Sequence, residues 1–287
     1  MELPSTRRTE MGTRDSQLAR DEPEEGTRCG LCRENRPLQN SHIISKWVVR
    51  RVRDSCTPPF RDPIVIEDGR AFTSSRQIKE RLLCSACEQR FSNAEDWVSR
   101  VSHKADGTCL ILDRPIVRYA DGSSLGRVRV SLLEPHEAQK LLLFGSSVLW
   151  RASVSREISS ARLGPVYEEP FRQYLLGGPF PQDAAASVFV LELGGSDPVA
   201  WEQVMSTPTS IRADGFHFHH FLMAGLYFHF SVGKRLPHQF STRLLTGPEP
   251  AFYRTDRGAI PPIDSLIGQV REARSTQRLL QQRKVRG

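Results

Sequence analysis

Cysteines are the residues whose spacing points most directly to chemistry. The sequence has six, and four of them form two Cys-x-x-Cys pairs, Cys29 with Cys32 and Cys84 with Cys87. Such a pair places two thiolates on one side of a tight turn, so two pairs supply the four sulfurs of a tetrahedral structural zinc site. Disulfides and redox-active pairs are the alternatives, but neither pair lies in the βαβ pattern of a thioredoxin-like motif. We therefore expect these four cysteines to bind Zn²⁺.

A histidine lies between the two pairs, in the sequence Ser-His-Ile-Ile of residues 41–44. A neutral imidazole with a pKa of about 6.5 can accept a proton from a metal-polarised water. The alternative for His42 is a structural role, in which its ring hydrogen-bonds and fixes an apolar strand. Glu95 also has two interpretations: a metal ligand, or the last residue of a Ser-x-x-Glu capping box that would start a helix at Ser92.

The order of these motifs resembles that of the HNH endonuclease family, also called the ββα-metal or His-Me finger group, over residues 27–103. The resemblance implies hydrolysis of phosphodiester bonds in DNA or RNA by one divalent ion such as Mg²⁺. It implies that His42 is the general base, that Glu95 is a second catalytic residue, and that Ser41 and Glu95 hold the ion. A wider resemblance, to bacterial proteins with the same Ser-His-Ile-Ile sequence and a Trp-Arg-Ala-Ser helix (here residues 150–153), assigns no chemistry.

Ser41 stands where the HNH family usually has a metal-binding Asp or His. A neutral hydroxyl is a poor replacement for a carboxylate on a hard divalent cation. The second hypothesis is therefore a non-catalytic zinc-containing module that binds nucleic acid or protein and has lost the catalytic metal site.

Basic side chains follow the histidine, at Lys46, Arg50, Arg51 and Arg53. We expect them to bind nucleic acid by contacting phosphates, which would make binding depend on salt. A solvated helix face is the alternative. The formal net charge of the chain is +7, and its positive excess is localised: residues 29–104 and residues 271–287 each carry a net charge of +5. This localisation favours a nucleic-acid-binding role for these two segments.

Four segments follow from composition and periodicity. Residues 1–28 read as a flexible tail, 29–104 as the zinc module, 105–270 as an α+β domain of unknown role, and 271–287 as a basic tail. The α+β domain should contain helices near residues 136–157 and 166–176, a strand near 187–193 and a hairpin over 216–232. The expected fold class is thus α+β: a four-cysteine ββα-metal module followed by an antiparallel sheet with helices.

The sequence lacks the roughly 18 consecutive apolar residues of a membrane-spanning helix, and its first residues lack the apolar core of a signal peptide. We therefore expect no membrane partner, a cytoplasmic location and reduced thiols. The sequence does not identify a protein partner of residues 105–270.

Overall fold

The structure is a computed structural model that describes residues 28–56, 62–67, 70–104, 106, 108–122, 126–192, 204–213, 215–236 and 245–255, with isolated positions 268, 269, 272 and 275. Nearly all of the expected N-terminal tail (1–28) and basic C-terminal tail (271–287) therefore lies outside the described residues. Among the residues described, no helix has the length and apolar character needed to cross a membrane.

In chain order the elements are β1 (Leu38–His42), α1 (Lys46–Asp54), β2 (Ile64–Glu67), β3 (Arg70–Thr73), β4 (Lys79–Cys84), α2 (Ser85–Val101), the short 3-10 helix η1 (Leu110–Asp113), β5 (Ile116–Gly122), β6 (Gly126–Leu132), α3 (Pro135–Val154), α4 (Pro165–Leu175), β7 (Ala184–Leu191), β8 (Val204–Ser206), β9 (Thr209–Ala213), β10 (Phe216–Met223), β11 (Leu226–Val232) and β12 (Ala251–Thr255). Helices and strands are interspersed up to α4, and six strands follow α4 with no helix between them among the described residues.

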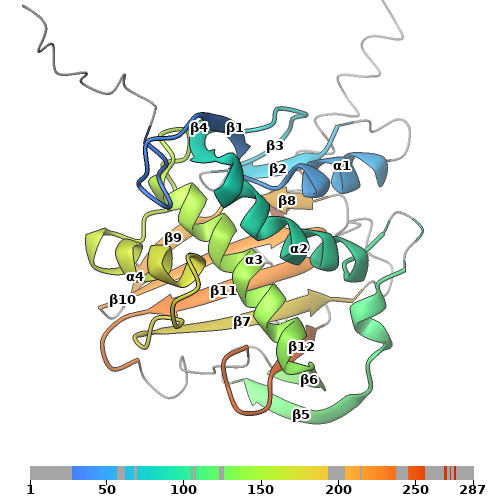
Figure 1. The fold of residues 1–287 in the computed structure, drawn as a ribbon. Coiled ribbons are helices and arrows are strands. Elements are labelled where there is room, and N and C mark those ends of the chain that lie inside the picture. The colour runs from blue at the N-terminus through green and yellow to red at the C-terminus, as the bar shows by residue number, and fades with distance from the viewer. Residues whose placement is uncertain are drawn as a thin grey trace, which may run out of the picture.

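Ten strands form one large sheet in the order β3-β2-β8-β10-β11-β7-β12-β6-β5, with β9 paired to β10. The pairs β2–β8 and β7–β12 are parallel, and the other pairs are antiparallel. Figure 1 shows α2, α3 and α4 in front of one face of this sheet. The fold is mixed α+β, as expected, although the sheet is mixed where the sequence suggested an antiparallel one.

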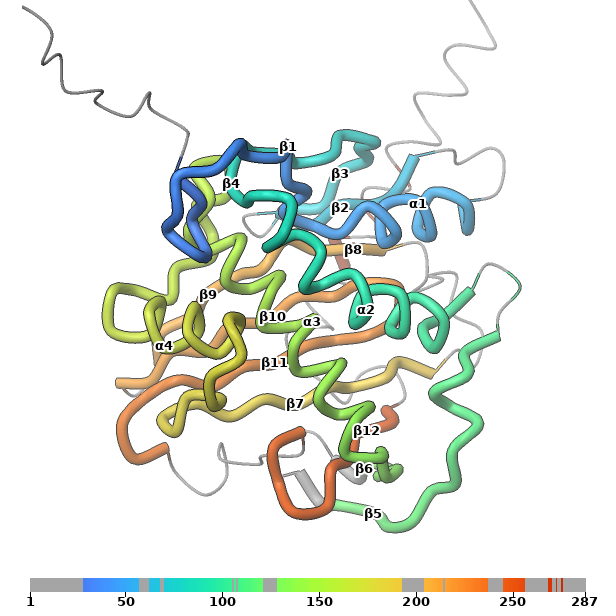
Figure 2. Tube along the Cα trace, viewed as in Figure 1, coloured from blue at the N-terminus to red at the C-terminus, as the bar shows by residue number. Residues whose placement is uncertain are grey.

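A second, two-stranded sheet pairs β1 with β4, and α2 begins directly after Cys84 at the end of β4. Figure 2 shows these two stretches of chain side by side above the large sheet. The register shifts at a bulge between Gln39 and Asn40. The segment between the strands contributes α1 to this region, but it sends β2 and β3 into the large sheet.

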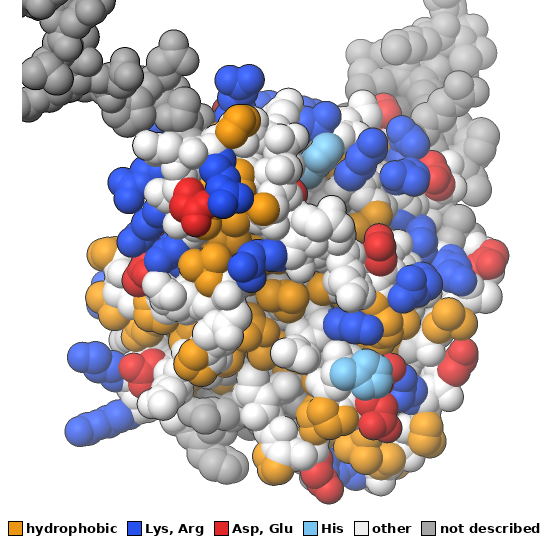
Figure 3. All heavy atoms as spheres, viewed as in Figure 1, with side chains coloured by type: hydrophobic (Ala, Val, Ile, Leu, Met, Phe, Trp, Pro, Cys, Tyr) orange, Lys and Arg blue, Asp and Glu red, His pale blue; other side chains and the backbone are white. Residues whose placement is uncertain are grey.

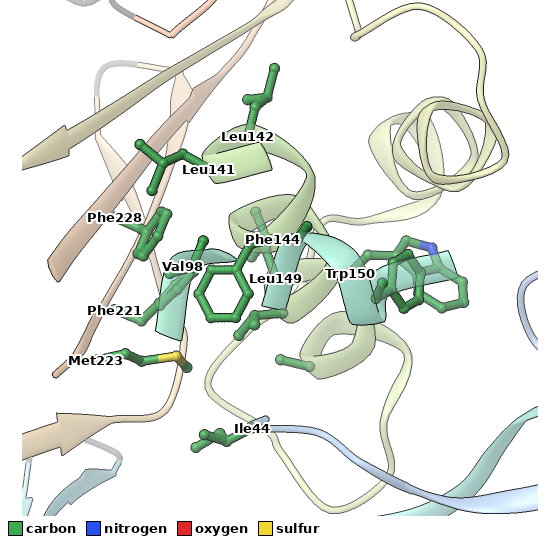
Figure 4. Close-up of a cluster of buried hydrophobic side chains, with 14 of the residues drawn as sticks. Ile44, Val98, Leu141, Leu142, Phe144, Leu149, Trp150, Phe221, Met223 and Phe228 are labelled. Atoms are coloured by element: carbon green, nitrogen blue, oxygen red, sulfur yellow. The ribbon is translucent and has the colours of Figure 1, made fainter. Parts of the chain in front are cut away.

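Helix α3 lies at the centre of the apolar core. It begins with Pro135 and a capping box between Glu134 and Glu137, which hydrogen-bond reciprocally at the first turn. Phe144 of α3 packs on Phe228 of β11, with ring centroids 5.5 Å apart, and Figure 4 shows these rings among the buried side chains of α2, α3 and the sheet. Most of α3 is buried because elements cover it on both sides.

The apolar core continues across residue 104. Trp47 of α1 lies against Phe144, with ring centroids 5.7 Å apart, and both neighbourhoods belong to one cluster of buried side chains. The division of the chain at residue 104 therefore stays a prediction, and a cut there would pass through shared packing.

Candidate zinc centre and nucleic-acid interface

The four paired cysteines meet at the end of the small sheet. Their sulfur atoms all lie within 4.8 Å of one another, and Cys32 Sγ is 3.9 Å from Cys84 Sγ. A tetrahedral ion with Zn–S bonds of about 2.3 Å would separate its sulfurs by roughly 3.8 Å, which agrees with this spacing. The four thiols therefore fit a structural zinc site, as predicted. In the described part of the chain they are the one group of three or more Cys, His, Asp or Glu ligand atoms able to hold a metal ion.

Backbone geometry shapes the first pair. The Arg33 N–H donates to the Cys29 carbonyl over 2.8 Å, and Arg33 itself adopts a left-handed conformation with φ of 64°. The Gly30 N–H donates to the Leu82 carbonyl over 2.9 Å, and a Cβ at Gly30 would come within 3.1 Å of the Leu82 side chain. A side chain at position 30 would thus push the first turn away from β4 and from the second pair.

Backbone N–H groups also act on the sulfurs. Burial raises the pKa of Cys29, but N–H donors from Cys84, Cys32 and Leu31 outweigh burial and bring that pKa down to about 7. The Cys84 N–H lies 3.3 Å from Cys29 Sγ. Burial raises the pKa of Cys87. A bound Zn²⁺ would supply the positive charge that keeps all four sulfurs as thiolates.

A buried arginine of α4 supports the first pair from outside. Arg172 donates to the Leu31 carbonyl and forms a 2.8 Å ion pair with Glu169. Hydrogen bonds from Arg172, followed by one from Gln173, lower the pKa of Glu169 to about 2. Sequence inspection missed Arg172, because nothing in its local pattern shows that it reaches a residue 141 positions earlier.

Ser41 and His42 make local contacts in the small sheet. The Ser41 hydroxyl is buried beside the bulge, where it accepts a hydrogen bond from the Leu83 N–H over 3.2 Å and donates weakly to the Gln39 carbonyl. The His42 ring is half-buried, and its Nε2 lies 2.8 Å from the Gln77 side-chain oxygen. Ser41 therefore connects β1 to β4, and His42 connects the end of β1 to the segment before β4.

Glu95 lies in the middle of α2, which begins at Ser85, so the capping-box interpretation, one of the two considered for Glu95, is wrong. The reason is that the chain turns directly from Cys84 into the helix. The Glu95 carboxylate accepts a hydrogen bond from Ser45 over 2.7 Å and pairs with the buried guanidinium of Arg151 over 2.9 Å. The sequence analysis missed this role of Arg151, although it singled out the surrounding Trp-Arg-Ala-Ser sequence.

Helix α1 separates its apolar and basic faces. Val48, Val49 and Val52 are buried, whereas Lys46, Arg50 and Arg53 are exposed. The three exposed cations follow a spacing of four and three residues, which places them along one helix face. Figure 3 shows Lys and Arg side chains gathered over α1 and the end of α2. We call Lys46, Arg50 and Arg53 the basic stripe.

Arg51 does not belong to the basic stripe. Its guanidinium turns toward α2, where it donates to the His103 carbonyl over 2.8 Å and to the Ser99 carbonyl over 3.2 Å. The sequence placed Arg51 with the three exposed cations because it lies among them along the chain. The helical turn separates it from them.

Comparison with known proteins shows to which family this chain belongs. Over 122 aligned residues the chain is 33% identical to the transcriptional repressor NrdR of Gluconobacter oxydans (strain 621H), and the alignment covers 40% of this chain and 69% of that repressor. The chain belongs to the NrdR family. The similarity to NrdR leaves more than half of the chain without a counterpart. No protein-family profile matches the chain, and no solved structure matches it significantly.

The similarity to NrdR corrects three predictions. The HNH endonuclease assignment, the phosphodiester-hydrolase function and the classification as an enzyme are wrong, because the matched protein is a transcriptional repressor. The catalytic roles of His42 and Glu95, and the Mg²⁺ site built from Ser41 and Glu95, depended on that assignment. The motifs that suggested it reflect a pair of zinc-binding turns joined to two strands and a helix, an arrangement that specifies a scaffold and no particular chemistry.

Proposed function

We propose that this protein is a zinc-containing transcriptional regulator that binds DNA through the basic stripe of α1. The observation that carries the proposal is the similarity to the transcriptional repressor NrdR. The four-thiol site and the exposed basic stripe support it, since a cluster of positive charge on one face is the electrostatic footprint of a nucleic-acid-binding protein.

The zinc site would stabilise the DNA-binding surface and would not itself contact DNA. Three of its four cysteines are buried, and Cys32 is half-buried. The site joins the turn before β1 to the end of β4 and the start of α2, and α2 in turn packs on α1. Zinc would therefore hold the surface from which the basic stripe projects.

The basic stripe provides the ligand contact. Neither Lys46 nor Arg50 has a carboxylate partner among the described residues, and Arg53 has only a long, exposed contact with Asp54, at 3.4 Å. Exposed ion pairs of this kind contribute little free energy. The three cations are therefore available to neutralise phosphates, and each phosphate neutralised would release counterions from the duplex.

Fluorescence anisotropy with a labelled, mixed-sequence DNA duplex tests this function. The zinc-loaded protein should bind, and Lys46→Gln, Arg50→Gln and Arg53→Gln combined should reduce the slope of log affinity against log salt by up to about 2.7, at about 0.9 per phosphate. A matched control replaces three exposed arginines that already form ion pairs, Arg36, Arg76 and Arg118, with Gln.

This triple control variant lowers the net charge by the same amount as the basic-stripe variant, but at positions outside the basic stripe. If both triple variants lose affinity equally, net charge and not the basic stripe governs binding. If the unsubstituted, zinc-loaded protein does not bind DNA at low salt, the proposed function fails.

A further inference from the structure

Helix α1 is held against α2 by side chains that do not belong to the basic stripe. At its start, Ser45 immediately precedes the helix and makes no side-chain cap bond to it. The Ser45 hydroxyl donates instead to Glu95 Oε1 over 2.7 Å. The first turn of α1 is therefore tied to the middle of α2.

Arg151 of α3 completes this connection. Its side chain is almost fully buried, with 1% relative exposure. One guanidinium nitrogen, Nη2, lies 2.9 Å from Glu95 Oε1 and 3.4 Å from Ser45 Oγ, while Nη1 donates to the His42 carbonyl over 2.8 Å. A single planar group thus contacts the end of β1, the residue before α1 and the middle of α2.

Arg51 provides a comparable attachment at the other end of α1. Its hydrogen bonds to the carbonyls of Ser99 and His103 reach the last turn of α2 and the residues that follow. With both ends attached to α2, the helix cannot roll or tilt without breaking charge-assisted hydrogen bonds, which are stronger than neutral ones.

We propose that Arg151, acting through Glu95 and Ser45, is a positioning residue for nucleic-acid binding: it fixes the orientation in which α1 presents the basic stripe. The inference rests on the proposed function. A buried ion pair contributes little net stability compared with an apolar replacement of similar size. The rigid, bidentate geometry of the guanidinium explains its presence better, since lysine cannot span the same partners.

The slope of log affinity against log salt separates positioning from stability. A variant that merely lowers the folded fraction reduces affinity at every salt concentration by the same factor and leaves the slope unchanged. A misoriented α1 neutralises fewer phosphates, so the slope becomes shallower by about 0.9 for each phosphate that is no longer neutralised. Arg151 cannot itself bind a phosphate, because it is buried.

The experiment measures DNA affinity from low to high NaCl for the unsubstituted protein, Arg151→Met and Ser45→Ala, each zinc-loaded and well below its unfolding temperature. Arg50→Met is the control for direct removal of one phosphate-binding cation, with an expected slope change of about 0.9. We expect Arg151→Met to change the slope by more than Arg50→Met does. Ser45→Ala should change it in the same direction, and this small substitution keeps the proposal testable if Arg151→Met does not fold.

An unchanged slope in folded Arg151→Met, or in folded Ser45→Ala where Arg151→Met does not fold, would overturn the positioning role. If the unsubstituted protein binds and Arg50→Met behaves as expected, the proposed function survives that result. Failure of the unsubstituted protein to bind DNA would overturn both.

Discussion

Cys32 and Cys84 place their sulfur atoms 3.9 Å apart, although 52 positions separate them along the chain. The chain between them contains β1, α1, β2, β3 and most of β4. An ion that bridges the two pairs therefore closes a long loop. Closing this loop costs conformational entropy, because the unfolded chain between the pairs must become ordered before all four thiolates can bind the metal. Folding of this region and zinc binding are consequently coupled.

This coupling predicts the behaviour of Cys32→Ser. The variant should lose zinc, measured by elemental analysis, because three thiolates bind more weakly than four. The loss of several kcal/mol of binding free energy should lower the unfolding temperature by roughly 10 °C. Cys56→Ser is the matched control, since its thiol lies outside the cluster and contacts the Val52 carbonyl. Full zinc content in Cys32→Ser would contradict the assignment of this ligand.

From one buried histidine, His219, and two half-buried ones, His220 and His229, of the β10–β11 hairpin, we predict a loss of stability in acid. Burial is the main cause that lowers the pKa of His219 to about 3, and it lowers those of His220 and His229 to about 4. In the folded chain these histidines stay neutral until a lower pH, whereas in the unfolded chain they bind protons near the usual histidine pKa of about 6.5. Stability is therefore complete above that pH and declines as the pH falls toward 4, by about 1.4 kcal/mol per pH unit for each proton taken up on unfolding.

Urea unfolding between pH 7 and pH 4.5 measures this dependence. His229→Gln should reduce the slope of stability against pH, because it removes one group that takes up a proton on unfolding. His136→Gln is the control, since His136 is exposed on α3. Equal slopes in the two variants would show that His229 does not contribute to the loss of stability in acid.

The sequence revealed the parts of the fold that depend on local signals. Apolar spacing located α3 to within three residues at each end. The hairpin expected over residues 216–232 is formed by β10 and β11, which turn at Ala224 and Gly225, both with positive φ angles. The sequence could not show that β2 and β3 leave the zinc region to join the large sheet. In that arrangement Ile64 pairs with Val204, 140 positions away along the chain. The local hydrophobic periodicity of a sequence carries no information about so distant a contact.

The candidate site likewise has one part that the sequence predicted and one part that it could not predict. The spacing of the four cysteines predicted their meeting, because the chemistry of zinc dictates it. The roles of Arg51 and Arg151 could not be predicted, because a sequence shows which arginines are close along the chain and not which turn inward. Glu95 illustrates the same limit: its carboxylate has the right chemistry for a metal ligand, but in the structure its partner is a guanidinium.

Gly225 predicts a strong and specific substitution effect. It adopts φ of 77°, and an added Cβ would lie 2.1 Å from His103 Cδ2. Gly225→Ala must therefore displace the His103 ring, whose Nε2 donates to the Leu191 carbonyl over 2.7 Å. Gly215 has a similar φ of 82° but open space around it, so Gly215→Ala should cost only about 1–2 kcal/mol of backbone strain. Chemical denaturation should show a clearly larger loss for Gly225→Ala, and equal losses would exclude the steric conflict with His103.

Separation of the chain at residue 104 predicts a failure to fold. A fragment of residues 105–287 would lack Trp47, which packs on Phe144, and it would lack β2, which pairs with β8. The large apolar surface thereby exposed should give a fragment that binds hydrophobic dyes and lacks a cooperative thermal transition. Dye fluorescence and calorimetry measure both properties, with the full chain as reference. A sharp transition at the unfolding temperature of the full chain would instead establish residues 105–287 as an independently folding domain, and the packing of Trp47 on Phe144 would then lie at an interface with that domain.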